Sequence, residues 1–279
     1  MTHHDGEASA INKTIGLPHT RASLAQDFAD LGFRNGQTVI WHSSLSSLGW
    51  VIGGANAVIL AMRDVLGDEG TLMIPTHSSA NSEPSYWQNP PVPETWWQLV
   101  RDHTPAFDPA TTQTRQLGII VELVRTLEGA QRSNHPAHSF AAVGRGAREL
   151  VGGITALHDG MGESSPLRAL YDRDGWVFLM GVGYGNCTAL HLAEMRSGRA
   201  TQTMMKQGAA VLVNGQREWV EYDSPMYDSD DFDALGEAFE QQYTNEVKQA
   251  RIGQAVCRLV RVQPLIDFGV QWMQSRSTT

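Results

Sequence analysis

The chain has 279 residues, a length that suits one large domain or two small ones with a substantial core. Hydrophobic residues make up 41% of it and charged residues 18%, the composition of an ordinary soluble globular protein. The net charge is −9 and Lys and Arg form no cluster, which excludes a general nucleic-acid binder and suits cationic ligands.

Cysteine usage and the N-terminal segment bear on the compartment. Cys187 and Cys257 lie far apart without a CxxC spacing, so they indicate neither a disulfide framework nor a thiolate zinc site. Residues 1–19 are polar and lack the apolar core of a secretory signal, and we expect them to be a mobile tail. No apolar run reaches the ~18 residues of a membrane span. We therefore expect a cytoplasmic protein with no membrane partner.

The first elements form a helix followed by a strand–helix–strand unit. Residues 21–31 place Leu24, Phe28 and Leu31 at helical spacing, and Gly32 ends the pattern. The segment "GQTVIWHSS" reads as a buried strand, residues 56–66 as a helix, and "GTLMIPT" as the next strand. Such a unit favours a right-handed crossover between parallel strands.

Residues 78–113 differ from the rest in being rich in Pro, Ser and Trp, with little periodicity. A loop of this length in a compact domain is usually functional or disordered. Its apolar anchors favour an ordered lid or pocket wall; they are Tyr86, Trp87, Trp96, Trp97 and Phe107.

The second half continues the alternation and then changes character. Helices are expected at 115–128, from about residue 145, and at the end of "GITALHDGMGESSPLRALY", followed by the buried strand "GWVFLMGV". The segment "AAVLVNGQREWVEYD" predicts a β-hairpin turning at Asn214-Gly215. An acidic helical stretch, "DSDDFDALGEAFEQQY", and a helix near 264–275 complete the chain. We predict one α/β domain over residues 20–279 with an appended hairpin and C-terminal helices, although a split near residue 200 is an alternative.

The motif "NCTALHLAE" follows the most hydrophobic strand. On a helix, Thr188, His191 and Glu194 share one face, and Cys187 lies one turn before His191. Open α/β sheets place ligand crevices at the carboxyl ends of strands, where this helix begins. The motif therefore predicts a functional site, while an ordinary surface His–Glu pair stays an alternative.

Three kinds of chemistry fit this motif. His191 is a candidate general base with a carboxylate holding its tautomer, because an imidazole titrates near neutral pH. Cys187 is a candidate thiolate nucleophile activated by His191. An HxxE pair could also supply two metal ligands, joined by His135 and His138, but it lacks the HExxH arrangement of a metalloprotease helix.

Two loops and one acidic cluster are further candidates. The loop "HSSLSSLGWVIGGAN" precedes a helix N-terminus, whose N–H groups suit a phosphate or an oxyanion, but it matches neither GxGxxG nor a P-loop. The segment "GESSPLRALY" fits a turn with a capped helix. Among the acidic residues 223–233, Asp223 at the end of the hairpin is the carboxylate we expect to point inward.

Several motifs together resemble one family, the aminoglycoside 3-N-acetyltransferases, which are distinct from the GNAT acetyltransferases. The resemblance runs from about residue 21 to the C-terminus and is strongest between 38 and 195. It rests on "HSSLSSLGWVIGGANAVILAMRDVLGDEGTLMIPT", "FDPATTQTRQLGIIVELV", "RSNHPAHSFAAVG", "GESSPLRALY" and "FLMGVGYGNCTALHLAE" in this order. It implies a three-layer α/β/α sandwich around a largely parallel or mixed sheet.

The resemblance also implies acetyl transfer from acetyl-CoA to the 3-amino group of a 2-deoxystreptamine aminoglycoside, without a metal. It assigns the catalytic base to His191 and matching acids to Glu194 and Asp223. The residues expected at the coenzyme A site are His42, Ser43, Ser44, Leu45, Ser47, Ser165, Pro166 and Leu167. Beside the cationic acceptor we expect His77, Glu83, Asp108 and Asp228.

Several points stay open at this stage. Residues 78–106 follow no pattern of the family, so the preferred drug is undetermined, and related members act on other amines. A Cys187 ping-pong acyltransferase and a catalytically silent binding homologue are two further hypotheses. A homodimer is possible, and nothing in the sequence decides whether Glu194 or Asp223 orients His191.

Overall fold

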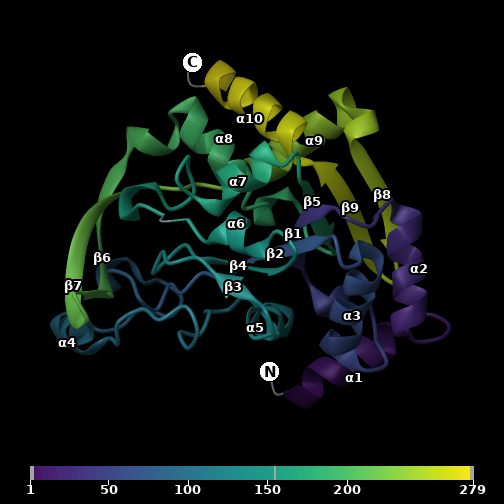
Figure 1. Ribbon diagram of the computed structural model, residues 1–279, viewed down its shortest axis with the longest axis horizontal. Coiled ribbons are helices and arrows are strands. Elements are labelled where there is room, and N and C mark those ends of the chain that lie inside the picture. Colours follow the sequence, from purple (N-terminus) through teal and green to yellow (C-terminus); the bar gives the residue numbers. More distant parts are fainter. Residues whose placement is uncertain (1–2, 154, 277–279) are drawn as a thin grey trace.

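The computed structural model describes residues 3–153 and 155–276. Its centre is a seven-stranded sheet in the order β3-β4-β2-β1-β5-β9-β8 (Figure 1). The strands are β1 (Thr38–Ser43), β2 (Thr71–Pro75), β3 (Gln131–Arg132), β4 (Phe140–Gly144), β5 (Trp176–Met180), β8 (Val247–Ile252) and β9 (Ala255–Arg261). Strands β2, β1 and β5 run parallel, and the strands outside them pair antiparallel, so the sheet is mixed.

Helices cover both faces of this sheet, which confirms the predicted three-layer α/β/α architecture (Figure 1). One face carries α2 (Arg21–Leu31), α3 (Gly54–Leu66) and α5 (Ile119–Arg125). The other carries α6 (Ala147–Val151), α7 (Pro166–Asp172), α8 (Leu190–Ser197), α9 (Phe232–Gln242) and α10 (Val262–Arg276).

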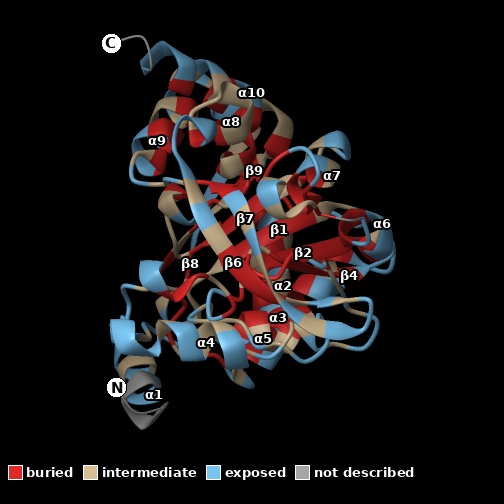
Figure 2. Cartoon of the chain, turned by 90° about the vertical axis from the view of Figure 1, so that its left-hand side faces the viewer, coloured by how far each residue is buried: buried red, intermediate tan, exposed pale blue. Residues whose placement is uncertain are grey.

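Alternation along the central strands builds two separate cores. Trp41 and Phe178 point to the face covered by α2 and α3, whereas Ile40 and Val177 point to the face covered by α8 and α10. Successive side chains of a strand face opposite sides of the sheet, so a continuous apolar run such as "WVFLM" places side chains in both cores. Figure 2 shows the resulting buried strands between two partly exposed helical layers.

The predicted hairpin forms from β6 (Met204–Val213) and β7 (Gln216–Pro225), a separate two-stranded sheet at one side of the molecule (Figures 1 and 2). Asn214 and Gly215 both have positive φ, as a two-residue turn of this kind requires. Beneath the hairpin lies α4 (Trp97–His103), part of the segment predicted as a lid or pocket wall. Asn81 exchanges two hydrogen bonds with the backbone of Ala210 in β6, which ties that segment to the hairpin.

The N-terminal segment differs from the sequence prediction, because His3–Lys13 forms helix α1 rather than an unpatterned tail. Trp50 donates through Nε1 to Glu7 at 3.2 Å and through its backbone N–H to Thr14 Oγ1 at 2.7 Å. These contacts come from a residue distant in the chain, and the local sequence therefore gives no sign of them. Within residues 3–153 and 155–276, no helix is both long and apolar enough to cross a membrane.

Candidate active site

His191 and Glu194 lie on α8, which follows the carboxyl end of β5 as predicted. The three-residue spacing brings His191 Nδ1 to 2.7 Å from Glu194 Oε2. The Glu194 side chain is 1% exposed and that of His191 is 14% exposed, so the pair is shielded while the imidazole keeps some access. Because Nδ1 donates to the carboxylate, Nε2 is the lone-pair nitrogen and is free to accept a proton.

The Glu194 carboxylate is held at its second oxygen as well. Oε1 accepts a hydrogen bond from the backbone N–H of Asp228 at 3.0 Å, and Arg199 Nε lies 3.4 Å from it. The His191 ring is packed between Tyr227 and Phe232, with ring centroids 5.2 and 5.0 Å away. The imidazole is therefore fixed in both tautomer and orientation, the arrangement that a general base requires.

Four more histidines lie near His191, where β1 and β2 end and β4 begins. His42 ends β1, His77 follows β2, and His135 and His138 precede β4. His138 stacks on His135 at 5.0 Å and meets His77 edge-on at 5.8 Å. Tyr227 contacts both His138, at 5.3 Å, and His191, so it connects this histidine cluster to the proposed base.

Burial keeps this histidine cluster neutral. It lowers the pKa of His42 and of His77 to about 3, with a smaller contribution to the same decrease from the neighbouring His191. Burial also lowers the pKa of His135 to about 4 and holds the pKa of His138 well below its usual range. His42 Nε2, His77 Nδ1 and His138 Nδ1 are buried and have no hydrogen-bond partner among the described residues.

The metal alternative for His135 and His138 gains no support from this geometry. Over the described part of the chain, no three His, Cys, Asp or Glu side chains are grouped so that they could hold a metal ion. His135 Nδ1 instead accepts backbone N–H bonds from Ala137 and His138, and the other ring nitrogen lies 3.2 Å from the carbonyl oxygen of Leu157.

A cavity of about 490 Å³ opens next to the histidine cluster. His77, His138, Met161 and Tyr222 line it together with residues of the predicted pocket-wall segment. The remaining lining residues are Ser79, Ser82, Tyr86, Trp87, Gln88, Asn89, Arg115, Gln116, Ala137 and Gln207. We call this cavity the acceptor pocket. The sequence pointed to the segment but not to Met161 or Tyr222, which the fold alone brings there.

The structure corrects the expectation for Asp223. Its side chain is 55% exposed and pairs across the hairpin with Lys206 at 2.7 Å, instead of pointing inward. Side chains alternate along a strand, and it is the preceding residue, Tyr222, that faces the pocket. Glu194 is therefore the carboxylate that contacts His191.

The other acids expected beside a cationic acceptor also lie elsewhere. Glu83 forms a bidentate pair with Arg101 and caps the short helix that follows it. Asp108 is exposed and holds its own turn through Ala110 N and Thr111. Asp228 approaches Glu194 only through its backbone, while its exposed side chain accepts from Asp230 N. Of the four residues expected at the acceptor, only His77 lines the acceptor pocket.

The residues expected to bind coenzyme A belong to two elements that lie against each other. His42 and Ser43 end β1, while Ser44, Leu45 and Ser47 form the turn that follows. The side chain of Ser165 caps α7, and Pro166 and Leu167 are buried in its first turn, where α7 lies against β1. In the turn, the backbone N–H of Ser44 donates to the carbonyl of Met180, and that of Ser47 donates to the carbonyl of Ser44. The backbone N–H groups of Leu45 and Ser46 have no hydrogen bond within the described chain.

Cys187 is buried against the core formed by α8 and α10. Burial raises the pKa of its thiol to about 12, so the thiolate that nucleophilic catalysis needs is strongly disfavoured.

Comparison with known proteins agrees with this geometry. Residues 40–274 match the family model described as aminoglycoside 3-N-acetyltransferase. The chain is 41% identical to the YokD protein of Bacillus subtilis, an SPbeta prophage-derived aminoglycoside N(3')-acetyltransferase-like protein, over 94% of this chain and 95% of the relative. It is 35% identical to aminoglycoside N(3)-acetyltransferase VII of Streptomyces paromomycinus, with 96% of each chain covered.

Solved structures give the same result. The crystal structure of YokD superposes with a TM-score of 0.93 and 38% identity over 98% of this chain and 99% of that one. A binary complex of AAC-IIIb with CoASH superposes with a TM-score of 0.79 and 27% identity over 93% and 98% of the two chains. The chain therefore belongs to the aminoglycoside 3-N-acetyltransferase family and is an acyltransferase.

Proposed function

We propose that this chain transfers the acetyl group of acetyl-CoA directly to the 3-amino group of a 2-deoxystreptamine aminoglycoside, with His191 as general base. The observation that carries the proposal is the shielded His191–Glu194 pair, which Tyr227 connects to His138, a lining residue of the acceptor pocket. Family membership supports the donor and the acceptor. The coenzyme A found with AAC-IIIb supports the same donor here.

The proposed step starts from the protonation state of the amine. An ammonium group has no lone pair, so a base must take its proton before or during attack on the thioester carbonyl. His191 Nε2 accepts that proton, the neutral amine forms the new N–C bond, and the C–S bond breaks to release the coenzyme A thiolate. The second proton lost by the attacking nitrogen passes to the thiolate, and the proton held by His191 is released to solvent. Glu194 stabilises the imidazolium in the meantime, through the 2.7 Å contact at Nδ1.

The developing negative charge on the carbonyl oxygen needs hydrogen-bond donors. The sequence indicates the loop after β1, and within it the N–H groups of Leu45 and Ser46 are the ones without an internal hydrogen bond. We assign these two groups to the oxyanion, with the surrounding β1 turn and the start of α7 holding coenzyme A. The raised pKa of Cys187 supports direct transfer over a covalent acetyl-cysteine.

The test is release of free thiol from acetyl-CoA with a panel of aminoglycosides and a control without acceptor. His191→Ala should lower turnover by ~10²–10⁴-fold, the usual contribution of general base catalysis, and leave coenzyme A binding nearly unchanged. His103→Ala, which removes an exposed imidazole on α4, is the matched control. Unchanged turnover in His191→Ala would remove this residue from the mechanism, and binding without thiol release would indicate a catalytically silent homologue.

One observation favours a second candidate, acylation of an amine that is not an antibiotic. No Asp or Glu belongs to the described lining of the acceptor pocket, although a polycationic drug is best held by carboxylates.

A further inference from the structure

The charge distribution of the acceptor pocket bears on the class of acceptor. This inference rests on the acetyl transfer proposed above and develops its second candidate, an amine that is not an antibiotic. Among the described lining residues, Arg115 carries the one permanent charge, and His77 and His138 are kept neutral by burial. Three carboxylates that were expected at the active site have other partners. The side chain of Glu83 pairs with Arg101, that of Asp223 pairs with Lys206, and that of Asp108 bonds within its own turn. The described lining of the pocket therefore carries a positive charge, although the whole chain is acidic.

Arg115 is placed to bind a ligand rather than to close an ion pair. Its backbone N–H donates to the carbonyl of His77 at 3.2 Å, and one guanidinium nitrogen donates to the carbonyl of Asn89 at 3.2 Å. The guanidinium carbon lies 5.1 Å from the centroid of the Trp87 ring. No carboxylate within the described residues pairs with it, so most of its donors remain for an oxyanion, the group that a guanidinium fork fits best.

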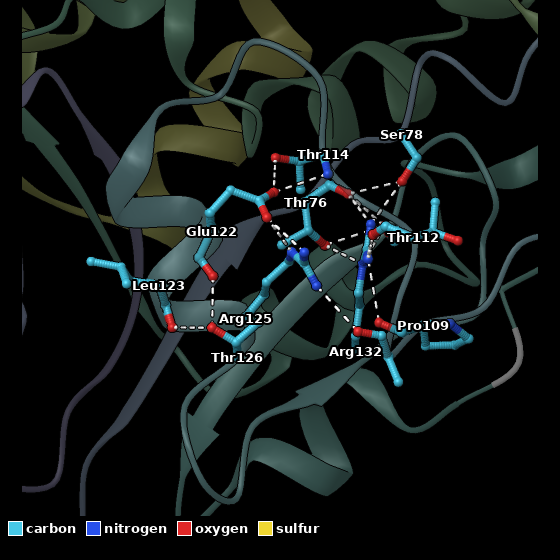
Figure 3. Close-up of polar contacts among 12 residues, drawn as sticks. Thr76, Ser78, Pro109, Thr112, Thr114, Glu122, Leu123, Arg125, Thr126 and Arg132 are labelled. Carbon is cyan, nitrogen blue, oxygen red and sulfur yellow. Dashed lines mark hydrogen bonds and ion pairs between the residues drawn. The ribbon is translucent and has the colours of Figure 1, made fainter. Parts of the chain in front are cut away.

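A second guanidinium adds to the positive potential from behind the pocket wall. Arg132 donates to six oxygens, none of them a carboxylate (Figure 3). Two of these oxygens, Thr76 O and Ser78 Oγ, lie 2.7 Å from Arg132 Nη2. They belong to the residues directly before and after His77 in the chain. Figure 3 also shows that the nearby Glu122 is turned to Arg125 and Thr114, so its charge is neutralised locally.

A chain of ring contacts connects the acceptor pocket to His191. His138 in the pocket lining contacts Tyr227, Tyr227 contacts His191, and Glu194 lies behind that imidazole with Arg199 at its other oxygen. We propose that the natural acceptor is a small primary amine whose other end carries an oxyanion, a phosphate or a carboxylate, bound by Arg115. Such an acceptor places its amine towards His191 and its oxyanion at Arg115, whereas a polycation would place additional ammonium groups against a guanidinium without a counter-ion.

The cavity volume of about 490 Å³ is in the range of small-molecule sites. The unpartnered nitrogens of His77 and His138 add uncharged hydrogen-bonding groups, which suit hydroxyls of the same acceptor. An amino sugar phosphate or an amino uronate combines all of these features.

The experiment compares three amino sugars that share one ring and one amine. These are glucosamine, glucosamine 6-phosphate and 2-amino-2-deoxyglucuronate, titrated calorimetrically into the protein saturated with coenzyme A, next to a polycationic aminoglycoside. We expect the phosphate or the carboxylate sugar to bind about 10- to 100-fold more tightly than glucosamine, as one or two charge-assisted hydrogen bonds provide. Arg115→Gln should abolish this preference, and added salt should weaken it.

Arg145→Gln is the matched control, because it removes an exposed arginine paired with Glu69 at the end of β4, near the start of β2 and away from the site. Equal binding of the three sugars, or a preference that survives Arg115→Gln, would overturn the inference. Stronger binding of the polycation than of both anionic sugars would do the same. Thiol release with each sugar is measured separately, so tight anion-dependent binding without release would refute the proposed acetyl transfer and leave the acceptor class supported.

Discussion

His42, His77 and His135 together account for about 6 kcal/mol of the stability that this protein should lose between pH 7 and pH 5, because they stay neutral in the fold. The structure lowers their pKa values from 6.5 to about 3, 3 and 4, through burial. In the unfolded chain each regains a pKa near 6.5 and takes up a proton at pH 5. The unfolded state therefore binds more protons than the folded state in this window.

The magnitude follows from the difference in proton uptake. One histidine with an unfolded pKa of 6.5 and a folded pKa of 3 or 4 favours the unfolded state by about 2 kcal/mol at pH 5. The three contributions add, because at pH 5 all three remain uncharged in the folded state and do not repel one another. Stability is thus fully present above about pH 6.5, and it is lost as the pH falls from there towards the folded values near 3 and 4.

Urea unfolding followed by circular dichroism at pH 7, 6 and 5 measures this loss. His77→Gln should remove about 2 kcal/mol of the pH dependence, while His103→Gln, at an exposed histidine, should leave it unchanged. Glu122 does not interfere, because its pKa is about 2 in the fold. A free energy of unfolding that changes by less than about 2 kcal/mol between pH 7 and 5 would refute the neutral buried cluster.

Three further outcomes can be checked directly. Glu194→Gln should lower turnover by about 10²–10⁴-fold, whereas Asp223→Asn should leave it unchanged, because of these two carboxylates only Glu194 contacts His191. Equal effects of the two substitutions on turnover in steady-state assays would contradict the geometry. Cys187→Ala should keep wild-type turnover and show no acetyl-enzyme by intact mass, whereas an inactive but folded variant would revive the covalent route. Burial alone would raise the pKa of Glu122, but bonds from Arg125 and Thr114 lower it to about 2. Since the side chain is 32% exposed, Glu122→Gln should cost only about 1–2 kcal/mol at pH 7, a difference that disappears in denaturation curves as the pH falls from about 4.5 to 2.

The strand–helix alternation and the hairpin were predictable because their patterns are local. Buried parallel strands read as unbroken apolar runs, and Asn-Gly between two β-patterned runs specifies a two-residue turn. Strands β8 and β9 were missed because their polar residues hide the pattern. In β9, Arg258 and Arg261 reach Glu240 and Asp174, partners that are distant in the sequence.

The site shows the same division between local and long-range information. His191 and Glu194 could be paired from helical spacing alone, because residues three apart share a face. Asp223 could not be placed, since a shift of one residue in a strand turns every side chain to the other face. The clustering of His42, His77 and His138 depends on three strand ends meeting at one edge, and no local pattern encodes that juxtaposition.

The net charge of the chain did not predict the charge of the acceptor pocket, and the reason is physical. A net charge of −9 states how many carboxylates exceed cations, but screened interactions act over about 10 Å, so only nearby groups set the potential of a pocket. Here Glu83 is paired with Arg101 and Glu122 with Arg125, whereas Arg115 and Arg132 are held by uncharged oxygens. The preference of this pocket for an acceptor should therefore follow its two guanidinium groups rather than the acidity of the chain, and exchanging Arg115 should change that preference more than any change in total charge at a distant surface.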